Sequence, residues 1–113
     1  MIIRTIKQED IKQIVDLELK FLGETIGEEL LLDSIKTPHL YFYVVEDINV
    51  IGYIGAYILA GQTEILNFVI DEKYQRQGIG QKLFDEILED SKINKSESVV
   101  LEANSLFIIN FYF

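Results

Sequence analysis

The sequence contains no cysteine, a single histidine, a single proline and no long apolar run. Without cysteine the chain can form neither disulfides nor thiolate metal sites, and the lone His39 does not favour a structural zinc site. No stretch approaches the roughly 20 apolar residues of a membrane-spanning helix, and the first residues do not follow the order of a signal peptide. These absences predict a cytoplasmic protein with no metal and no membrane partner.

Basic residues are also few, because 10 Lys and Arg stand against 19 Asp and Glu, which gives a net charge of −9. Nucleic-acid binding needs a positive surface, so we do not expect DNA or RNA as a partner. An acidic surface favours a cationic partner, such as a basic polypeptide or an amine, mainly by raising the association rate. The same carboxylates could serve solubility alone, and the composition does not separate these two interpretations.

What is present fits one domain, since the chain has 113 residues and 49% of them are hydrophobic. Periodicity and turn residues predict strands over 2–5, 40–46, 50–60, 64–70 and 98–102, and helices over 9–22, over 28–35 and from 78 onward. Gly61 and Gln62 are expected to form the turn before the third strand of the meander. The order predicts an α/β fold with a mixed sheet, in which an antiparallel meander is followed by one crossover.

The segment that joins the strand over 64–70 to the following helix has the character of an anion site. Backbone N–H groups at a helix N-terminus lack intrahelical partners and carry partial positive charge. Gly78 and Gly80 have no side chains that would keep a pyrophosphate away from those groups. A glycine pair could equally serve only tight packing of the helix. A P-loop is excluded by spacing, and so is a Rossmann fingerprint, because Leu83 stands where its third glycine belongs.

With Gln75-x-x-Gly78-x-Gly80, this segment resembles the signature of the GNAT superfamily of N-acyltransferases, Gln/Arg-x-x-Gly-x-Gly/Ala. The resemblance spans roughly residues 2–102, and Tyr74 to Gly80 with Leu101-Glu102 resembles the RimI-type ribosomal-protein alanine N-terminal acetyltransferases. It implies a GNAT fold, with acetyl-CoA as co-substrate and a primary amine as acceptor, above all the α-amine at a protein N-terminus. The residues that it implies for the cofactor are Phe68, Val69, Ile70, Gln75, Arg76, Gln77, Gly78, Ile79, Gly80 and Gln81.

The catalytic residues that the resemblance implies lie at the end of the chain. Glu102 matches the family's general base, Tyr112 matches the tyrosine that protonates the leaving thiolate, and Asn104 is the nearest counterpart of a cofactor-binding asparagine. Between Glu102 and Tyr112 the sequence is two residues shorter than the family pattern. On a helix this difference rotates the residues that follow by about 200°. Because of this rotation Tyr112 could be an ordinary packed aromatic residue, and Glu102, which precedes it, could be no more than a solvated strand terminus.

The family continues beyond the position of Phe113 with further strands, so the resemblance predicts a single domain, 1–113, that is incomplete at its C-terminus. The strand over 98–102 would then be an exposed edge, which a homodimer or another partner could cover. The family's Pro-Trp pair is replaced by Thr25-Ile26. Three functions stay open: acetylation of a protein N-terminus, acetylation of a small-molecule amine, and a non-catalytic CoA-binding module.

Overall fold

The computed structural model describes residues 1–101, and the side chains of residues 1–100. The elements in chain order are β1 (Ile2–Thr5), the 3-10 helix η1 (Gln8–Asp10), α1 (Ile11–Leu22), α2 (Glu28–Ser34), β2 (Leu40–Asp47), β3 (Asn49–Leu59), β4 (Gln62–Ile70), the 3-10 helix η2 (Glu72–Tyr74), α3 (Ile79–Ile93) and β5 (Ser98–Leu101). This confirms the predicted α/β order up to the last strand. The helix expected after it lies outside the described residues.

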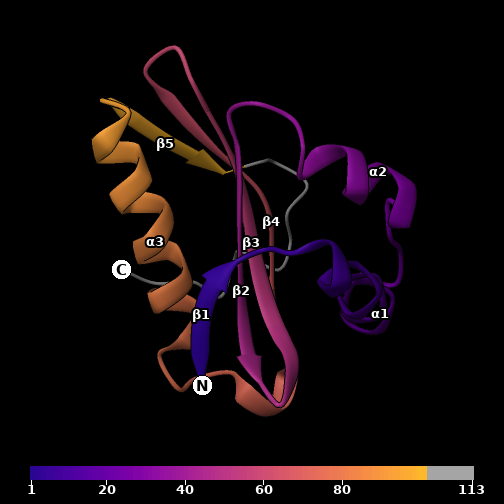
Figure 1. Cartoon of the computed structure of the whole chain (residues 1–113). Helices are drawn as coiled ribbons and strands as arrows, with labels where there is room; N and C mark the ends of the chain where they lie inside the picture. The colour runs from indigo at the N-terminus through magenta and orange to yellow at the C-terminus, as the bar shows by residue number, and fades with distance from the viewer. Residues whose placement is uncertain (102–113) are drawn as a thin grey trace.

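The strands form one mixed sheet in the order β1-β2-β3-β4-β5. The first four strands are antiparallel neighbours, whereas β5 returns through α3 and pairs parallel to β4. Figure 1 shows α3 on one side of the sheet and α1 with α2 on the other. The predicted meander with one terminal crossover is therefore confirmed.

Each face of the sheet has its own apolar core. On the α3 side, Ile54 and Phe68 pack with Leu83 and Phe84. On the α1 side, Val44, Tyr53 and Val69 pack with residues of α1 and α2 such as Ile14 and Leu31. The central strand β3 is buried along most of its length because helices cover it from both sides. Neighbouring residues of the inner strands thus face different layers.

The turn predicted at Gly61 and Gln62 is displaced by one residue, because Gln62 is the first residue of β4 and Ala60, predicted as the end of a strand, belongs to the turn. Ala60 and Gly61 both have positive φ angles, 53° and 79°. Two consecutive residues with positive φ are typical of the tightest hairpins, since their twist matches that of the flanking strands. Strand β3 therefore ends one residue earlier than predicted and β4 begins two residues earlier.

Strand β4 is irregular halfway along its length. Its described pairing with β5 covers Gln62–Ile65 and runs to the last described residue of β5. Directly after Ile65 the register with β3 skips Leu66, since Ala56 pairs with Ile65 and Gly55 with Asn67. Such a β-bulge bends the strand and redirects the residues that follow. The second half of β4 leads into the turn before α3.

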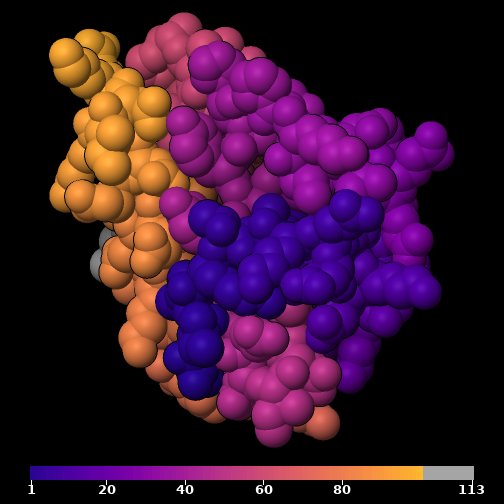
Figure 2. Space-filling view, viewed as in Figure 1, coloured from indigo at the N-terminus to yellow at the C-terminus, as the bar shows by residue number. Residues whose placement is uncertain are grey.

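An ion pair fixes the N-terminal strand to the start of α1. The Asp10 carboxylate is 2% exposed and accepts hydrogen bonds from Arg4 Nη1 at 2.7 Å, from Arg4 Nη2 at 2.9 Å and from the Lys7 amide at 2.7 Å. Burial acts to raise the pKa of Asp10, but the bonds from Arg4 and Lys7 outweigh it, so that this pKa lies below its usual value. Figure 2 shows the indigo N-terminal residues crossing the front of the molecule toward α1.

We expect Asp10→Asn to lower the free energy of unfolding by about 2–4 kcal/mol at pH 7, because it removes a charge partner from the buried end of the pair. Since the folded-state pKa of Asp10 is depressed, its stabilisation is fully present above about pH 4 and disappears as the pH falls through that folded-state pKa. Urea denaturation at several pH values should therefore show that the free energies of unfolding of the unsubstituted chain and of Asp10→Asn become equal in acid.

The matched control is Glu46→Gln. Glu46 also pairs with Arg4, at 3.3 Å, but its side chain is 38% exposed, so we expect a loss below about 1 kcal/mol. Equal losses in the two variants would show that burial of Asp10 does not set the strength of the pair.

Candidate functional site

The turn between β4 and α3 has an unusual backbone path. After η2, Gln75 is extended, Arg76 has a φ of 63° and Gly78 has a φ of 78°, and α3 begins at Ile79. A positive φ is easy for glycine and uncommon for arginine, so the segment is held in this shape by its surroundings. The chain thereby turns sharply and brings consecutive backbone N–H groups together ahead of the helix.

Six consecutive amides at this turn have no hydrogen-bond partner among the described residues. They belong to Arg76, Gln77, Gly78, Ile79, Gly80 and Gln81, and the first amide with a partner is that of Lys82, which donates to the Gly78 carbonyl at 3.2 Å. The N-cap residue Gly78 offers no side chain to cap them either. Since the helix dipole adds partial positive charge here, the arrangement favours an anion.

Two glutamine side chains hold the turn from outside. Gln75 Nε2 donates to the Ile70 carbonyl at 3.0 Å, and Gln77 Nε2 donates to the Lys73 carbonyl at 3.3 Å. The Tyr74 hydroxyl bonds to Asp47 in the β2–β3 hairpin, which raises the pKa of Tyr74. The side chains of Gln75 and Gln77, both predicted to bind a cofactor, thus shape the turn itself.

Several of the predicted cofactor residues have side chains that face the core. Phe68 and Ile79 are 5% and 3% exposed and lie in the cluster under α3, while Val69 is 3% exposed and lies in the cluster under α1. Ile70 packs partly against the α3 cluster. The side chains of Phe68, Val69 and Ile79 are therefore not in a position to contact a ligand, whereas that of Ile70 is only partly buried.

In the second half of β4, the backbone N–H and C=O groups of alternate residues point away from β3. The Asp71 amide donates to the Ile51 carbonyl of β3 at 2.7 Å, whereas the Ile70 carbonyl accepts from Gln75 outside the sheet. Because consecutive residues direct their backbone groups to opposite edges, the groups of Phe68 point to the same side as those of Ile70. This side lies beyond the described pairing with β5.

The turn carries basic residues next to acidic ones. Lys73, Arg76 and Lys82 follow Asp71 and Glu72 within twelve positions. The Arg76 side chain is exposed beside the unpaired amides. Its guanidinium therefore agrees with the preference of the amides for an anionic ligand.

A hydrogen-bonded group that was not predicted from the sequence lies on the other face of the sheet, beneath α1. Glu18 of α1 is 2% exposed and accepts from the Tyr53 hydroxyl and, at 2.5 Å, from Thr25 Oγ1. Thr25 Oγ1 in turn accepts from the Gly27 amide at 3.1 Å. Burial and the neighbouring Glu18 carboxylate raise the pKa of Tyr53, which keeps it protonated. The signal in the sequence was a glutamate on the apolar stripe of α1.

The predicted catalytic residues Glu102 and Tyr112, and the predicted cofactor residue Asn104, lie outside the described residues. The structure does place Leu101, which directly precedes Glu102, at the end of β5 and opposite Ile65. Their roles therefore remain predictions.

Residues 1–101 contain no group of three or more His, Cys, Asp and Glu side chains that could hold a metal ion. In the same part of the chain, no helix is long and apolar enough to span a bilayer.

Comparisons with known proteins agree with this fold. The solved structure of an aminoglycoside acetyltransferase from an uncultured soil metagenomic sample is similar to this structure, with a TM-score of 0.78 and 20% sequence identity. The alignment covers 98% of this chain and 84% of that protein. The ribosomal-protein-S18-alanine N-acetyltransferase from Escherichia coli is 14% identical, over 96% of this chain and 71% of its own, with a TM-score of 0.77. At these identities the likeness shows the fold, and it confirms the predicted GNAT architecture.

A relative from Bacillus subtilis (strain 168), named as a ribosomal protein bS18-alanine N-acetyltransferase, is 26% identical over 102 residues, which are 88% of this chain and 68% of that protein. The sequence model of the Acetyltransferase (GNAT) family matches residues 9–112. Since this match spans nearly the whole sequence, the chain belongs to the GNAT family of acetyltransferases.

Proposed function

We propose that this enzyme transfers an acetyl group from acetyl-CoA to the α-amino group at a protein N-terminus. The observation that carries the proposal is the row of amides from Arg76 to Gln81 that have no partner among the described residues. A pyrophosphate is the anion that such a row suits, because its oxygens can accept several N–H bonds at once.

The turn also has the space that a phosphate needs. A methyl group built at Gly78 would meet nothing within 4 Å, so open space lies next to the backbone at the start of the helix. Arg76 and Lys82 can add charge-assisted bonds from either side of the amides. We infer that Gln75 and Gln77 contribute by holding the turn, and Gln81 through its backbone, since its side chain bonds to Asp85 at 2.8 Å.

The second half of β4 suits the arm of the same co-substrate. The backbone groups of Ile70 point away from β3, and an extended amide-containing chain can pair with a strand edge there as an added strand does. The arm would then run from the turn toward the end of β5, where Glu102 follows Leu101.

Acetyl-CoA supplies a thioester whose carbonyl carbon the neutral amine attacks, so that a C–N bond forms and the C–S bond breaks. In this proposal Glu102 takes the proton from the amine, Tyr112 donates a proton to the thiolate, and Asn104 contacts the co-substrate. An α-amine with a pKa near 8 is roughly one-tenth neutral at pH 7, whereas a lysine amine is almost wholly protonated. A single carboxylate base is therefore sufficient for an N-terminal acceptor.

The B. subtilis relative supports a protein N-terminus as acceptor, and the net charge of −9 favours cationic partners. We expect a tetrapeptide with a free N-terminal alanine to be acetylated in the presence of acetyl-CoA, as detected by mass spectrometry. The same peptide with a blocked α-amine and a free lysine should react far more slowly. Preferential acetylation of polyamines or aminoglycosides would contradict the acceptor.

For the phosphate site, we expect Gly78→Ala to weaken binding of CoA by on the order of tenfold or more. The new methyl group would compete with the pyrophosphate for the open space next to the amides. Calorimetric titration measures the change. Gly61→Ala is the matched control: Gly61 has a φ of 79° against 78° for Gly78, and a methyl group there also meets nothing within 4 Å. The two variants should lose similar stability, and equal CoA affinity in both would refute the site.

For the base, we expect Glu102→Gln to lower turnover at pH 7 by on the order of 10²-fold, because the amide cannot accept the proton. The deficit should shrink at pH 9, where most of the α-amine is neutral without help. Glu97→Gln, at an exposed carboxylate just before β5, serves as the control and should leave turnover unchanged. A loss that does not vary with pH would mean that Glu102 does not act as a base.

A further inference from the structure

Strand β3 carries two glycines at places where a side chain has no room. A methyl group built at Gly52 would lie 2.7 Å from Cδ1 of Ile70 and 2.9 Å from the backbone carbonyl oxygen of Val69, both in β4. A methyl group built at Gly55 would lie 2.5 Å and 2.8 Å from two ring carbons of Phe42 in β2. Distances this short require a neighbouring atom to move. Each glycine therefore permits a close approach, but to a different strand.

The atoms that would have to move differ in kind at the two positions. Among the described residues, the three atoms nearest to a methyl group at Gly55 all belong to the ring of Phe42, so the crowding there falls on a side chain. At Gly52 they include two backbone atoms of β4, the Val69 oxygen and, at 3.4 Å, the Cα of Ile70. Ile70 is also the residue that pairs with Gly52 across the two strands. A side chain at Gly52 would therefore push the main chain of β4 away from β3.

Ile70 is the last residue of β4, and it contacts the turn before α3 in two ways. Its backbone carbonyl accepts the hydrogen bond from Gln75 Nε2 at 3.0 Å. Its side chain packs partly against the apolar cluster under α3, to which Tyr74 and Ile79 also belong. Because interiors are closely packed, a displacement of Ile70 is passed on to the residues around it. The position of Ile70 therefore affects the turn on which the unpaired amides lie.

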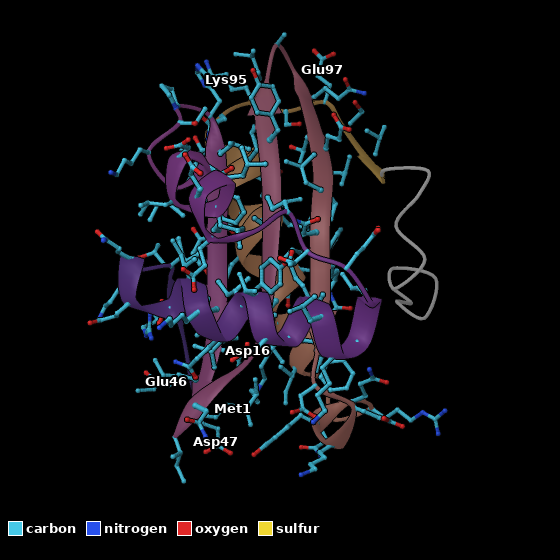
Figure 3. The ribbon with its side chains drawn as sticks, turned by 90° about the vertical axis from the view of Figure 1, so that its right-hand side faces the viewer. Met1, Asp16, Glu46, Asp47, Lys95 and Glu97 are labelled. Atoms are coloured by element: carbon cyan, nitrogen blue, oxygen red, sulfur yellow. The ribbon has the colours of Figure 1, made fainter. Side chains whose placement is uncertain are left out.

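Both strands meet the turn at one end of the sheet. Figure 3 shows the β2–β3 hairpin, marked by Asp47, and the turn before α3 at the same end, which is the lower end in this view. Gly52 follows this hairpin closely, since β3 begins at Asn49. One residue before Gly52, the Ile51 carbonyl accepts from the Asp71 amide at 2.7 Å. The backbone of β3 is thus bonded directly to the residue with which the turn begins.

The geometry points to Gly52 as a positioning residue for the co-substrate. By letting β4 lie close to β3 at Ile70, it holds the turn in the shape that keeps the amides from Arg76 to Gln81 together. This inference rests on the proposed function, in which these amides bind the pyrophosphate of acetyl-CoA. Gly52 acts through β4 and not through contact with the ligand. A substitution there should therefore change the binding of CoA and leave the binding of the acceptor unaltered.

Gly52→Ala tests this role, and Gly55→Ala is its matched control, because it adds the same methyl group to an equally crowded place on the same strand. We expect Gly52→Ala to weaken CoA binding on the order of tenfold, since small misplacements of binding groups have large effects. Gly55→Ala should leave this affinity unchanged, although both variants should lower the midpoint of thermal unfolding. Calorimetric titration measures the affinity. In Gly52→Ala the KM for acetyl-CoA should rise, while the KM for the alanine tetrapeptide should not.

The amide NMR signals of residues 76–81 give a measurement that needs no ligand. They should shift in Gly52→Ala and stay in place in Gly55→Ala. An Ile70→Val background removes the Cδ1 carbon that the new methyl group would meet, so Gly52→Ala should weaken CoA binding less in that background. If Gly52→Ala alone does not fold, the comparison with Gly55→Ala is made in that background.

The outcomes separate this inference from the proposed function. If the unsubstituted chain binds no CoA, the proposed function fails and this inference fails with it. If CoA binds and the two glycine variants have equal affinity, only the inference about Gly52 is overturned. The same holds if the amide signals of residues 76–81 do not move in Gly52→Ala, or if the KM values for acetyl-CoA and for the tetrapeptide rise equally.

Discussion

The first turn of α3 contains backbone amides that no α-helix can bond within itself, and the site depends on how the chain leaves them. In most helices a side chain at the N-cap satisfies one of these groups, but here the N-cap is Gly78, which has no such side chain. Gln75 and Gln77 stabilise the turn from the outside and leave the amides accessible. The exposed row of amides is therefore a property of the backbone path, and the side chains serve to keep that backbone in place.

Strand β4 contacts both ends of the crossover that contains α3. At its start, Thr63 Oγ1 lies 2.7 Å from Ser91 Oγ of α3 and donates to Ser96 Oγ at 2.8 Å, and the Glu97 amide bonds to the Gly61 carbonyl. These bonds fix the C-terminal end of α3 and the start of β5 next to β4. At its other end β4 leads into the turn at the N-terminus of α3. The crossover therefore fixes both the turn before α3 and the start of β5 relative to β4.

Two buried carboxylates of η1 and α1 are compensated in different ways. Asp10 is paired with the Arg4 guanidinium, so that its charge is balanced and the N-terminal strand is fixed. Glu18 is satisfied by hydroxyl groups from β3 and from the segment after α1, so that its bonds are directional and its charge is not cancelled by a described cation. The first arrangement stabilises the sheet edge, whereas the second determines the position of a loop.

The sequence alone determined the order of the elements and the position of the turn before α3, because both depend on local patterns: the periodicity of apolar residues and the spacing of Gln75, Gly78 and Gly80. Tertiary structure decided which groups face the site. The helices on both faces of the sheet bury the side chains of Phe68, Val69 and Ile79 in the two apolar cores. Likewise, a glutamate on an apolar stripe gives no indication of its partners, since Tyr53 is 35 residues away from Glu18 in the chain and only the packing of α1 on β3 brings them together.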